Sequence, residues 1–129
     1  GGVLTYQILS SNLDKLDNIK TIIVDPHRDL KLVREKVSSL GFYIDDETII
    51  YEDKVYYFIV KFKRGKIDKP YSTKELLLGP KLLIKKEPIF LLWLEEQRKK
   101  VSSLLNKGLT KEKRDQALAL YRVIVSALK

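Results

Sequence analysis

Residues 21–62 decide the fold, and they read TIIVDPHRDLKLVREKVSSLGFYIDDETIIYEDKVYYFIVKF. The first four residues form a short apolar run that Pro26 stops, which predicts a buried strand over 21–24. Apolar residues then recur at 30, 33, 37 and 40 on one face of a helix, and Gly41 follows them as a C-terminal cap. We therefore expect a strand of parallel type followed by a helix.

The remainder of this stretch, residues 42–62, predicts two strands joined as an antiparallel hairpin. β-branched and aromatic residues are frequent on both sides of Glu52 and Asp53, where the chain is expected to turn. Strand, helix, strand and strand in this order are typical of an α/β domain. The predicted fold class of this part is therefore α/β.

The C-terminal part predicts two long helices. Pro88 stands where a first helical residue is favoured, and Thr110 can cap the last helix. Residues at heptad spacing follow in each segment: Phe90, Leu94, Gln97, Val101 and Leu104 over 89–105, and Ala117, Tyr121, Ile124 and Leu128 over 111–128. Because only a short loop joins the segments, we expect them to pair antiparallel as an α-helical coiled-coil domain.

Composition excludes several classes of function. The chain of 129 residues has no cysteine, which excludes disulfides and thiol catalysis and is compatible with a cytoplasmic protein in a reducing compartment. No apolar run approaches the roughly 20 residues of a membrane span. The acidic run Asp45, Asp46 and Glu47 has no histidine nearby, so we expect no metal site. Walker and dinucleotide-binding glycine motifs are absent from the sequence.

The net charge of +8 is unevenly distributed. Residues 1–60 carry 7 Lys/Arg and 10 Asp/Glu, whereas residues 61–129 carry 18 and 7, which gives −3 and +11. We expect a domain boundary in the polar stretch between, with domains 1–66 and 67–129. The basic half predicts a polyanionic partner such as RNA. The candidate RNA-binding residues are Lys61, Lys63, Arg64, Lys66, Lys81, Lys85, Lys86, Arg98, Lys99 and Lys100. The alternative is a solvated, lysine-rich surface without a partner.

Several residues together resemble a known family. The most specific set is Gly79-Pro80, Pro88, Phe90, Trp93 and Leu94, and upstream Gly41, Glu47, Glu52, Asp53, Tyr56 and Tyr57 agree with it. In this order they are similar to the bacterial tRNA (adenine-22-N1)-methyltransferase family, over nearly the whole chain. The resemblance implies the C-terminal part of an S-adenosylmethionine-dependent, Rossmann-like methyltransferase domain, followed by a helical coiled-coil domain that binds tRNA.

The resemblance also implies a site. Gly1 and Gly2 look like the end of the family's Gly-Met-Gly-Gly turn beside the transferable methyl, so they are candidate catalytic and cofactor-binding residues. At the end of the first strand the family usually has Leu-Gln-Pro-Asn, where this chain has Val24-Asp25-Pro26-His27, and Asp25, Pro26 and His27 are candidate catalytic residues. An aspartate there could accept from the adenine amine, and His27 could donate to phosphate.

Two other interpretations of these site residues stay open. Asp25 or Asp29 could instead cap the following helix, because an aspartate side chain can accept from free N–H groups at a helix start. Gly1-Gly2 could be the remnant of an added tag.

The implied reaction is methyl transfer to N1 of adenine 22, and the family's main cofactor loops precede the position of Gly1. We therefore expect the missing N-terminal half of the methyltransferase domain to be a partner, and the 129 residues alone to be inactive. N1 has its own lone pair, so positioning matters more than a strong base. N1 lies on the Watson–Crick edge, so the base must first be unpaired. The alternative is a standalone RNA-binding or protein-interaction module without catalytic activity.

Overall fold

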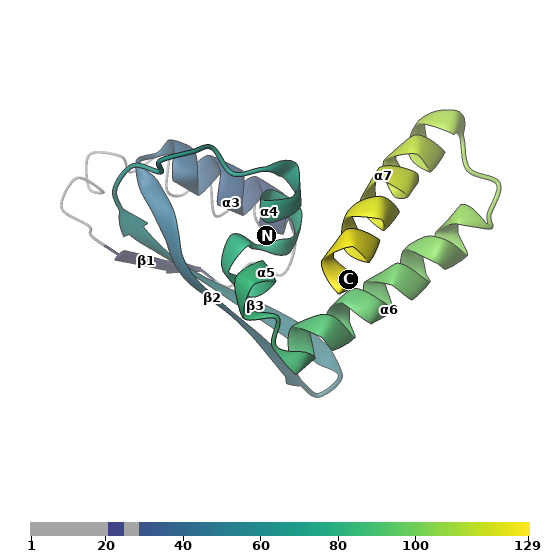
Figure 1. Cartoon of the computed structure of the whole chain (residues 1–129), viewed down its shortest axis with the longest axis horizontal. Coiled ribbons are helices and arrows are strands. Elements are labelled where there is room, and N and C mark those ends of the chain that lie inside the picture. Colours follow the sequence, from purple (N-terminus) through teal and green to yellow (C-terminus); the bar gives the residue numbers. More distant parts are fainter. Residues whose placement is uncertain (1–20, 25–28) are drawn as a thin grey trace. The chain divides into compact units, whose positions relative to one another are not determined.

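The computed structural model describes residues 21–24 and 29–129 (Figure 1). The elements in chain order are β1 (Thr21–Val24), α3 (Leu30–Ser39), β2 (Phe42–Glu52), β3 (Val55–Arg64), α4 (Thr73–Leu78), α5 (Pro80–Lys85), α6 (Pro88–Leu105) and α7 (Lys111–Leu128). The chain divides into two compact units, of which the first ends at Lys85 and the second covers Lys86–Lys129. The predicted strand, helix, hairpin and paired helices are thus confirmed.

The described sheet has three strands in the order β1-β3-β2. β3 pairs antiparallel with both neighbours, so β1 and β2 run in the same direction on either side of it. The expectation that the first strand has a parallel neighbour is therefore wrong for the described sheet. The returning strand of the hairpin inserts between β1 and β2, which the order of elements along the chain does not reveal.

A β-bulge at Asp45 determines which side chains of β2 face the core. Ile44 pairs with Phe62 and Asp46 pairs with Lys61, so Asp45 is an extra residue in β2. Before the bulge Ile44 is buried, and after it the inward positions shift by one residue, so Glu47 is buried instead of Asp46. The bulge therefore re-aims one carboxylate into the interior, as bulges commonly do near functional sites.

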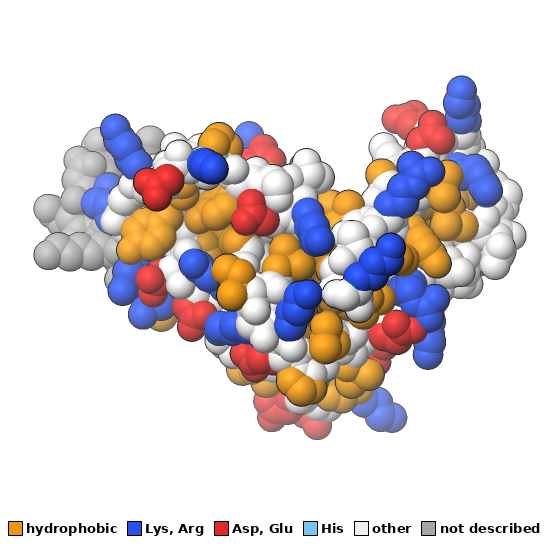
Figure 2. Space-filling view, viewed as in Figure 1, with side chains coloured by type: hydrophobic (Ala, Val, Ile, Leu, Met, Phe, Trp, Pro, Cys, Tyr) orange, Lys and Arg blue, Asp and Glu red, His pale blue; other side chains and the backbone are white. Residues whose placement is uncertain are grey.

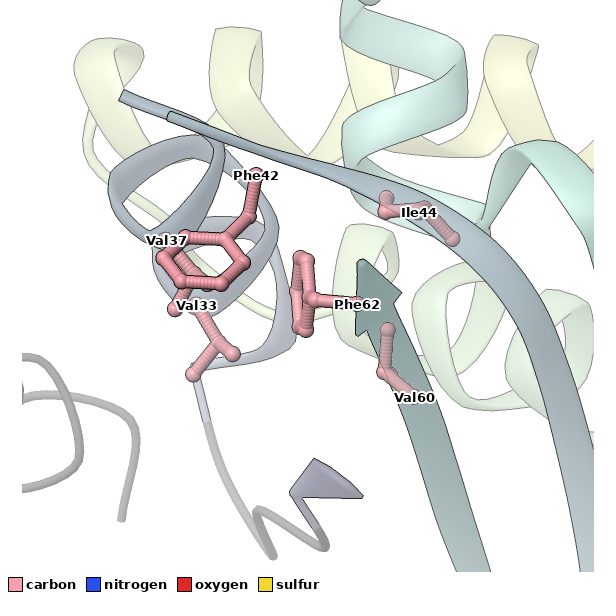
Figure 3. Close-up of a cluster of buried hydrophobic side chains, with 6 residues drawn as sticks. All are labelled: Val33, Val37, Phe42, Ile44, Val60 and Phe62. Atoms are coloured by element: carbon pink, nitrogen blue, oxygen red, sulfur yellow. The ribbon is translucent and has the colours of Figure 1, made fainter. Parts of the chain in front are cut away.

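The core of the first unit lies between α3 and the sheet. Figure 3 shows Val33 and Val37 of α3 beside side chains from β2 and β3, and all six side chains of the cluster are at most 1% exposed. The other members are Phe42, Ile44, Val60 and Phe62. Burying a side chain of this size contributes about 1.5–3 kcal/mol, so the cluster is the main apolar attachment of α3 to the sheet.

The short helices α4 and α5 belong to the same unit as the sheet. Ser72 and Glu75 form a capping box at the start of α4. α4 packs on α3, and α5 packs on β2. These contacts place both helices with the sheet, whereas the charge pattern predicts a domain boundary after residue 66.

The second unit is a pair of helices. α6 begins at Pro88, and the Thr110 side chain caps α7 by accepting from the Lys113 amide at 3.3 Å. Figure 1 shows α6 and α7 running antiparallel, and they pack against each other. The buried residues are Phe90, Leu94 and Val101 of α6, and Ala117, Ile124 and Ala127 of α7. The predicted seam is confirmed at five of these positions, and it did not include the sixth, Ala127. Leu104 was predicted to lie in the seam but is exposed, because it lies in the last turn of α6, so that prediction is wrong.

No helix within residues 21–24 and 29–129 combines the length and the apolar character that crossing a bilayer requires.

The hairpin turn offers a stability test. Asp53 and Lys54 have φ values of 50° and 65°, so both residues adopt the left-handed conformation of a tight two-residue turn. That conformation costs a non-glycine residue roughly 1–2 kcal/mol, and glycine loses about 0.5–1 kcal/mol more entropy on folding. We expect Lys54→Gly to stabilise the fold by about 0.5–1 kcal/mol in urea unfolding.

Thr48→Gly is the matched control, because Thr48 lies within β2 and not in the turn. Glycine in a strand interior is destabilising, so this control should lower the free energy of unfolding. A lower stability of Lys54→Gly than of the parent chain would contradict the turn geometry.

Candidate nucleic-acid interface

The predicted catalytic and cofactor-binding residues lie outside the described part of the chain: Gly1, Gly2, Asp25, Pro26 and His27. Asp29 is described and occupies the N-cap position of α3 with a φ of 59°. Its side chain makes no capping hydrogen bond, and only its backbone carbonyl accepts from the Val33 amide at 3.0 Å. The capping role suggested for Asp29 is therefore wrong.

Each carboxylate of the acidic run has a different cationic partner. Asp45 lies 3.8 Å from the Lys61 ammonium and 3.5 Å from the Lys63 ammonium. The next carboxylate, Asp46, lies 2.6 Å from the Lys85 ammonium. Glu47 alone turns inward. The bulge thus distributes the three acids among separate ion pairs, and within the described residues no group of three or more potential metal-ligating side chains occurs.

Arg34 and Glu47 form a buried ion pair. Arg34 Nε donates to Glu47 Oε2 at 2.8 Å, and both side chains are 1% exposed. Arg34 Nη1 donates to the carbonyls of Leu76 at 2.9 Å and Leu77 at 3.2 Å, while Glu47 Oε1 accepts from the Lys81 amide at 2.9 Å. The pair therefore bonds to the end of α4 and the start of α5 together.

Electrostatics make this pair interdependent. Burial lowers the pKa of the Arg34 guanidinium below its ordinary value, and the charge and hydrogen bond of Glu47 oppose that shift. Arginine keeps its charge in proteins, so the guanidinium needs a compensating carboxylate in the interior. Glu47 supplies that charge, and the carbonyls of Leu76 and Leu77 accept from Nη1. Arg34 Nη2 is buried and has no hydrogen-bond partner among the described residues.

Gly79 leaves room for the ion pair. A Cβ at this position would lie 2.7 Å from Glu47 Oε1 and 2.8 Å from Arg34 Nη2, closer than real Cβ contacts. Its φ of 97° also lies in the left-handed region that disfavours side chains. A glycine is therefore required where α4 ends against the buried charges.

The same network positions two lysines of α5. The Lys81 side chain projects from the residue whose amide binds Glu47. Lys85 donates to the Glu47 carbonyl at 2.7 Å and pairs with Asp46, and its hydrogen bond to Asp46 lowers the pKa of that carboxyl. Lys85 thus already ties α5 to β2, and an RNA-binding role for it stays a prediction.

The other predicted basic residues of the first unit differ in their surroundings. Lys61 and Lys63 share Asp45, as described above. The Arg64 guanidinium lies over the Phe42 ring, 4.8 Å from its centroid. Figure 2 shows basic side chains interleaved with acidic ones over the face in view. In the predicted cluster 61–66, two of the four basic residues therefore have an acidic neighbour.

In the second unit the predicted residues lie on α6 and just before it. Arg98 pairs with Glu95 and lowers the pKa of that carboxyl. Lys86 donates to the Lys129 carbonyl at 3.5 Å. Lys99 and Lys100 are exposed. Lys86 just before α6 is exposed as well, so three predicted residues of this unit face solvent.

A pocket of about 300 Å³ brings Lys66 and Lys81 together, although they are distant in sequence. Lys69, Tyr43 and Tyr71 also line it, together with Ile44, Ile67 and Asp68. Sequence reasoning assigned Lys66 and Lys81 to separate clusters and missed the other lysine and both tyrosines. The sequence feature that could have identified them is a lysine near a tyrosine, because nucleic-acid sites combine basic residues for the backbone with aromatic rings for the bases.

Comparison with known proteins gives a consistent match. A family model described as tRNA (adenine(22)-N(1))-methyltransferase matches residues 1–128. A candidate tRNA (m1A22) methyltransferase from Streptococcus pneumoniae is similar, with 26% identity, 100% of this chain and 58% of that chain covered, and a TM-score of 0.92. Another structure of that protein contains S-adenosyl-L-methionine. No curated protein sequence matches this chain significantly.

Two further solved structures share the fold. A protein of the NADB-Rossmann superfamily from Streptococcus agalactiae has 27% identity and a TM-score of 0.91, with 100% of this chain and 56% of that chain covered. The Bacillus subtilis M1A22 tRNA methyltransferase TrmK has 21% identity and a TM-score of 0.85, with 100% and 60% covered. The chain thus has a partial Rossmann-like methyltransferase fold and spans somewhat over half the length of these relatives.

The buried ion pair predicts a strong double-mutant coupling. Glu47→Gln leaves the buried Arg34 guanidinium without a compensating charge, so we expect a loss of about 3–5 kcal/mol in the free energy of unfolding. Arg34→Met should cost a similar amount. The double variant Arg34→Met/Glu47→Gln should lose clearly less than the two single losses together. Chemical denaturation measures all three.

Lys31→Gln is the control, because it removes an exposed ion pair from the same helix. Lys31 lies 3.8 Å from Glu35, and both side chains are nearly half exposed. Such pairs contribute about 0–1 kcal/mol. Two results would contradict the proposed coupling of Arg34 with Glu47. One is additive losses of unfolding free energy in the double variant, and the other is a loss for Glu47→Gln no larger than for Lys31→Gln.

Proposed function

We propose that this chain, which belongs to the tRNA (adenine(22)-N(1))-methyltransferase family, is part of an enzyme that transfers a methyl group from S-adenosylmethionine to N1 of adenine 22 in tRNA. The observation that carries the proposal is the family match over residues 1–128. The similarity to the Streptococcus pneumoniae structure, which extends over 100% of this chain, supports it independently. Those relatives are longer, so the activity belongs to the whole enzyme.

The proposed role of residues 1–66 is to complete the Rossmann-like methyltransferase domain. The sheet order β1-β3-β2 supports this, because a hairpin whose return strand inserts beside β1 closes a sheet at one side. Residues 67–129 would add the helical coiled-coil domain. α4 and α5 lie after residue 66 but pack on α3 and β2 of the first unit. We therefore propose that α6 and α7 of the helical domain bind tRNA.

The proposed cofactor is S-adenosylmethionine. A structure of the Streptococcus pneumoniae relative contains it, and a structure of the M. capricolum relative contains its product, S-adenosyl-homocysteine. Gly1 and Gly2 are proposed to lie beside the methyl, where a glycine backbone can approach a flat substrate closely. They are outside the described residues, so no chemical step is assigned to a described side chain.

The proposed chemistry depends mainly on positioning. N1 of neutral adenine has a lone pair that attacks the methyl group, so the enzyme needs no strong base. Holding N1 in line with the methyl supplies much of the rate, and oxygen atoms nearby would stabilise the cationic product. Asp25 and His27 remain candidates for contacts with the base and with phosphate. Because N1 is on the pairing edge, the adenine has to be unpaired or extruded.

Methyl incorporation tests the proposed function. We expect the full-length enzyme to methylate tRNA at adenine 22 and to lose this activity when the tRNA carries guanine there, since guanine N1 has no free lone pair. Mass spectrometry of nuclease fragments locates the product. Binding of tRNA without any methyl incorporation would contradict the proposal and favour a standalone RNA-binding module.

The division of labour within the enzyme can also be tested. We expect residues 1–129 alone to show no S-adenosylmethionine binding by calorimetry, since the main cofactor loops are proposed to belong to the rest of the enzyme. Micromolar binding by this chain would contradict that assignment.

The helical pair gives a third test. Lys99 and Lys100 are exposed on α6, so Lys99→Glu/Lys100→Glu should weaken tRNA binding by the full-length enzyme without changing cofactor affinity. Filter binding across a salt series measures this. Lys111→Glu/Lys113→Glu is a control of equal charge at the start of α7. If the Lys99→Glu/Lys100→Glu variant weakens tRNA binding no more than the control does, Lys99 and Lys100 are solvated residues that do not contact tRNA.

A further inference from the structure

The pocket lined by Tyr43, Lys66, Lys69, Tyr71 and Lys81 differs from the other basic parts of the first unit. Its volume is about 300 Å³, and Asp68 is the one acidic residue in its lining. Three lysines and one aspartate leave the lining with an excess of positive charge. A lining of this kind attracts an anion, and its size suits a small group of atoms rather than a folded partner.

The three lysines of the pocket have no carboxylate within ion-pair distance among residues 21–24 and 29–129. Lys61, Lys63 and Lys85 of the same unit do have such carboxylates. The described part of the unit thus pairs the lysines around the bulge with carboxylates and provides no such partner for those of the pocket. Like charges held near each other repel, so an external anion would stabilise them.

The aromatic side of the pocket is fixed in place. The Tyr71 hydroxyl accepts from the Ile44 amide at 2.9 Å, which holds the ring against β2. A Cβ on Gly65 would lie 3.0 Å from two atoms of the Tyr43 ring, so the chain passes close beneath that ring. Both rings are therefore held by β2 and by the segment after β3. Aromatic rings next to lysines form the usual platform for nucleotides, with stacking beside phosphate contacts.

The pocket lies near the row of the sheet that contains the start of β1. Tyr43 pairs with Lys63, which also pairs with Thr21 at the start of β1. Asp25 follows the other end of β1, where Val24 pairs with Val60. Three residues of β3 separate these rows, a distance on the order of 10 Å along the strand.

We propose that this pocket binds the phosphate backbone of the tRNA at a point separate from the adenine that is methylated. The inference rests on the proposed function for the identity of the RNA. Lys66, Lys69 and Lys81 contact phosphate oxygens, and Tyr43 and Tyr71 contact the adjoining nucleotide. The contacts position the tRNA and do not read its sequence, as phosphate contacts generally do.

The test is tRNA binding by the full-length enzyme with Lys66→Gln/Lys69→Gln/Lys81→Gln. We expect the Kd to rise about tenfold and the salt slope to fall by about 0.7–0.9 for each lost phosphate contact. Affinity for S-adenosylmethionine should not change. Lys31→Gln/Lys36→Gln/Lys74→Gln is the matched control, with the same change of charge in the same unit and no residue in the pocket. Equal effects of the two triple variants would overturn the proposal.

Lysine acetylation gives a second measurement that needs no variant. We expect bound tRNA to protect Lys66, Lys69 and Lys81 from acetylation, with Lys31 still reactive. Protection by adenosine monophosphate alone, with none by tRNA, would overturn the proposal in favour of a small-nucleotide site.

The two proposals fail in different ways. An enzyme that binds tRNA through the pocket and transfers no methyl contradicts only the proposed function. Methylation at adenine 22 with a wild-type Kd and salt slope in the pocket variant contradicts only the pocket.

Discussion

The buried ion pair between Arg34 and Glu47 is the constraint on which the rest of the first unit depends. A guanidinium and a carboxylate are costly to bury, and they are tolerated only when their hydrogen bonds are provided. Here the partners are backbone groups at the end of α4 and the start of α5. Four elements, α3, β2, α4 and α5, are thus held by one pair of charges at 2.8 Å.

Two local features make that pair possible. The bulge at Asp45 turns Glu47 inward, and Gly79 leaves the space that a side chain would occupy. The consequence reaches the surface, because α5 carries Lys81 into the basic pocket and Lys85 onto the acidic face of β2. A structural interaction inside the unit therefore decides where the two lysines of α5 lie.

The elements were largely predictable from the sequence, whereas their partners were not. Apolar periodicity identified α3, the hairpin and the paired helices, because each buries one face. Position 34 lies on the same helical face as 30, 33 and 37, but a charged residue in a helix is usually exposed, so the burial of Arg34 was not predicted. Strand alternation cannot reveal a bulge, so the burial of Glu47 was missed. Charge runs predicted basic clusters, but they carry no information on pairing, and Lys61, Lys63 and Lys85 proved to have acidic partners.

Hydrogen exchange on the Glu47→Gln variant tests most directly whether the ion pair holds α4 and α5 on the sheet. Local opening exposes the amides of the segment that detaches, so exchange resolves it by element. The account predicts a selective loss of protection at the Leu83 amide of α5 and in α4, with protection in α7 unchanged. Unchanged protection in α4 and α5, or an equal loss throughout both units, would contradict it.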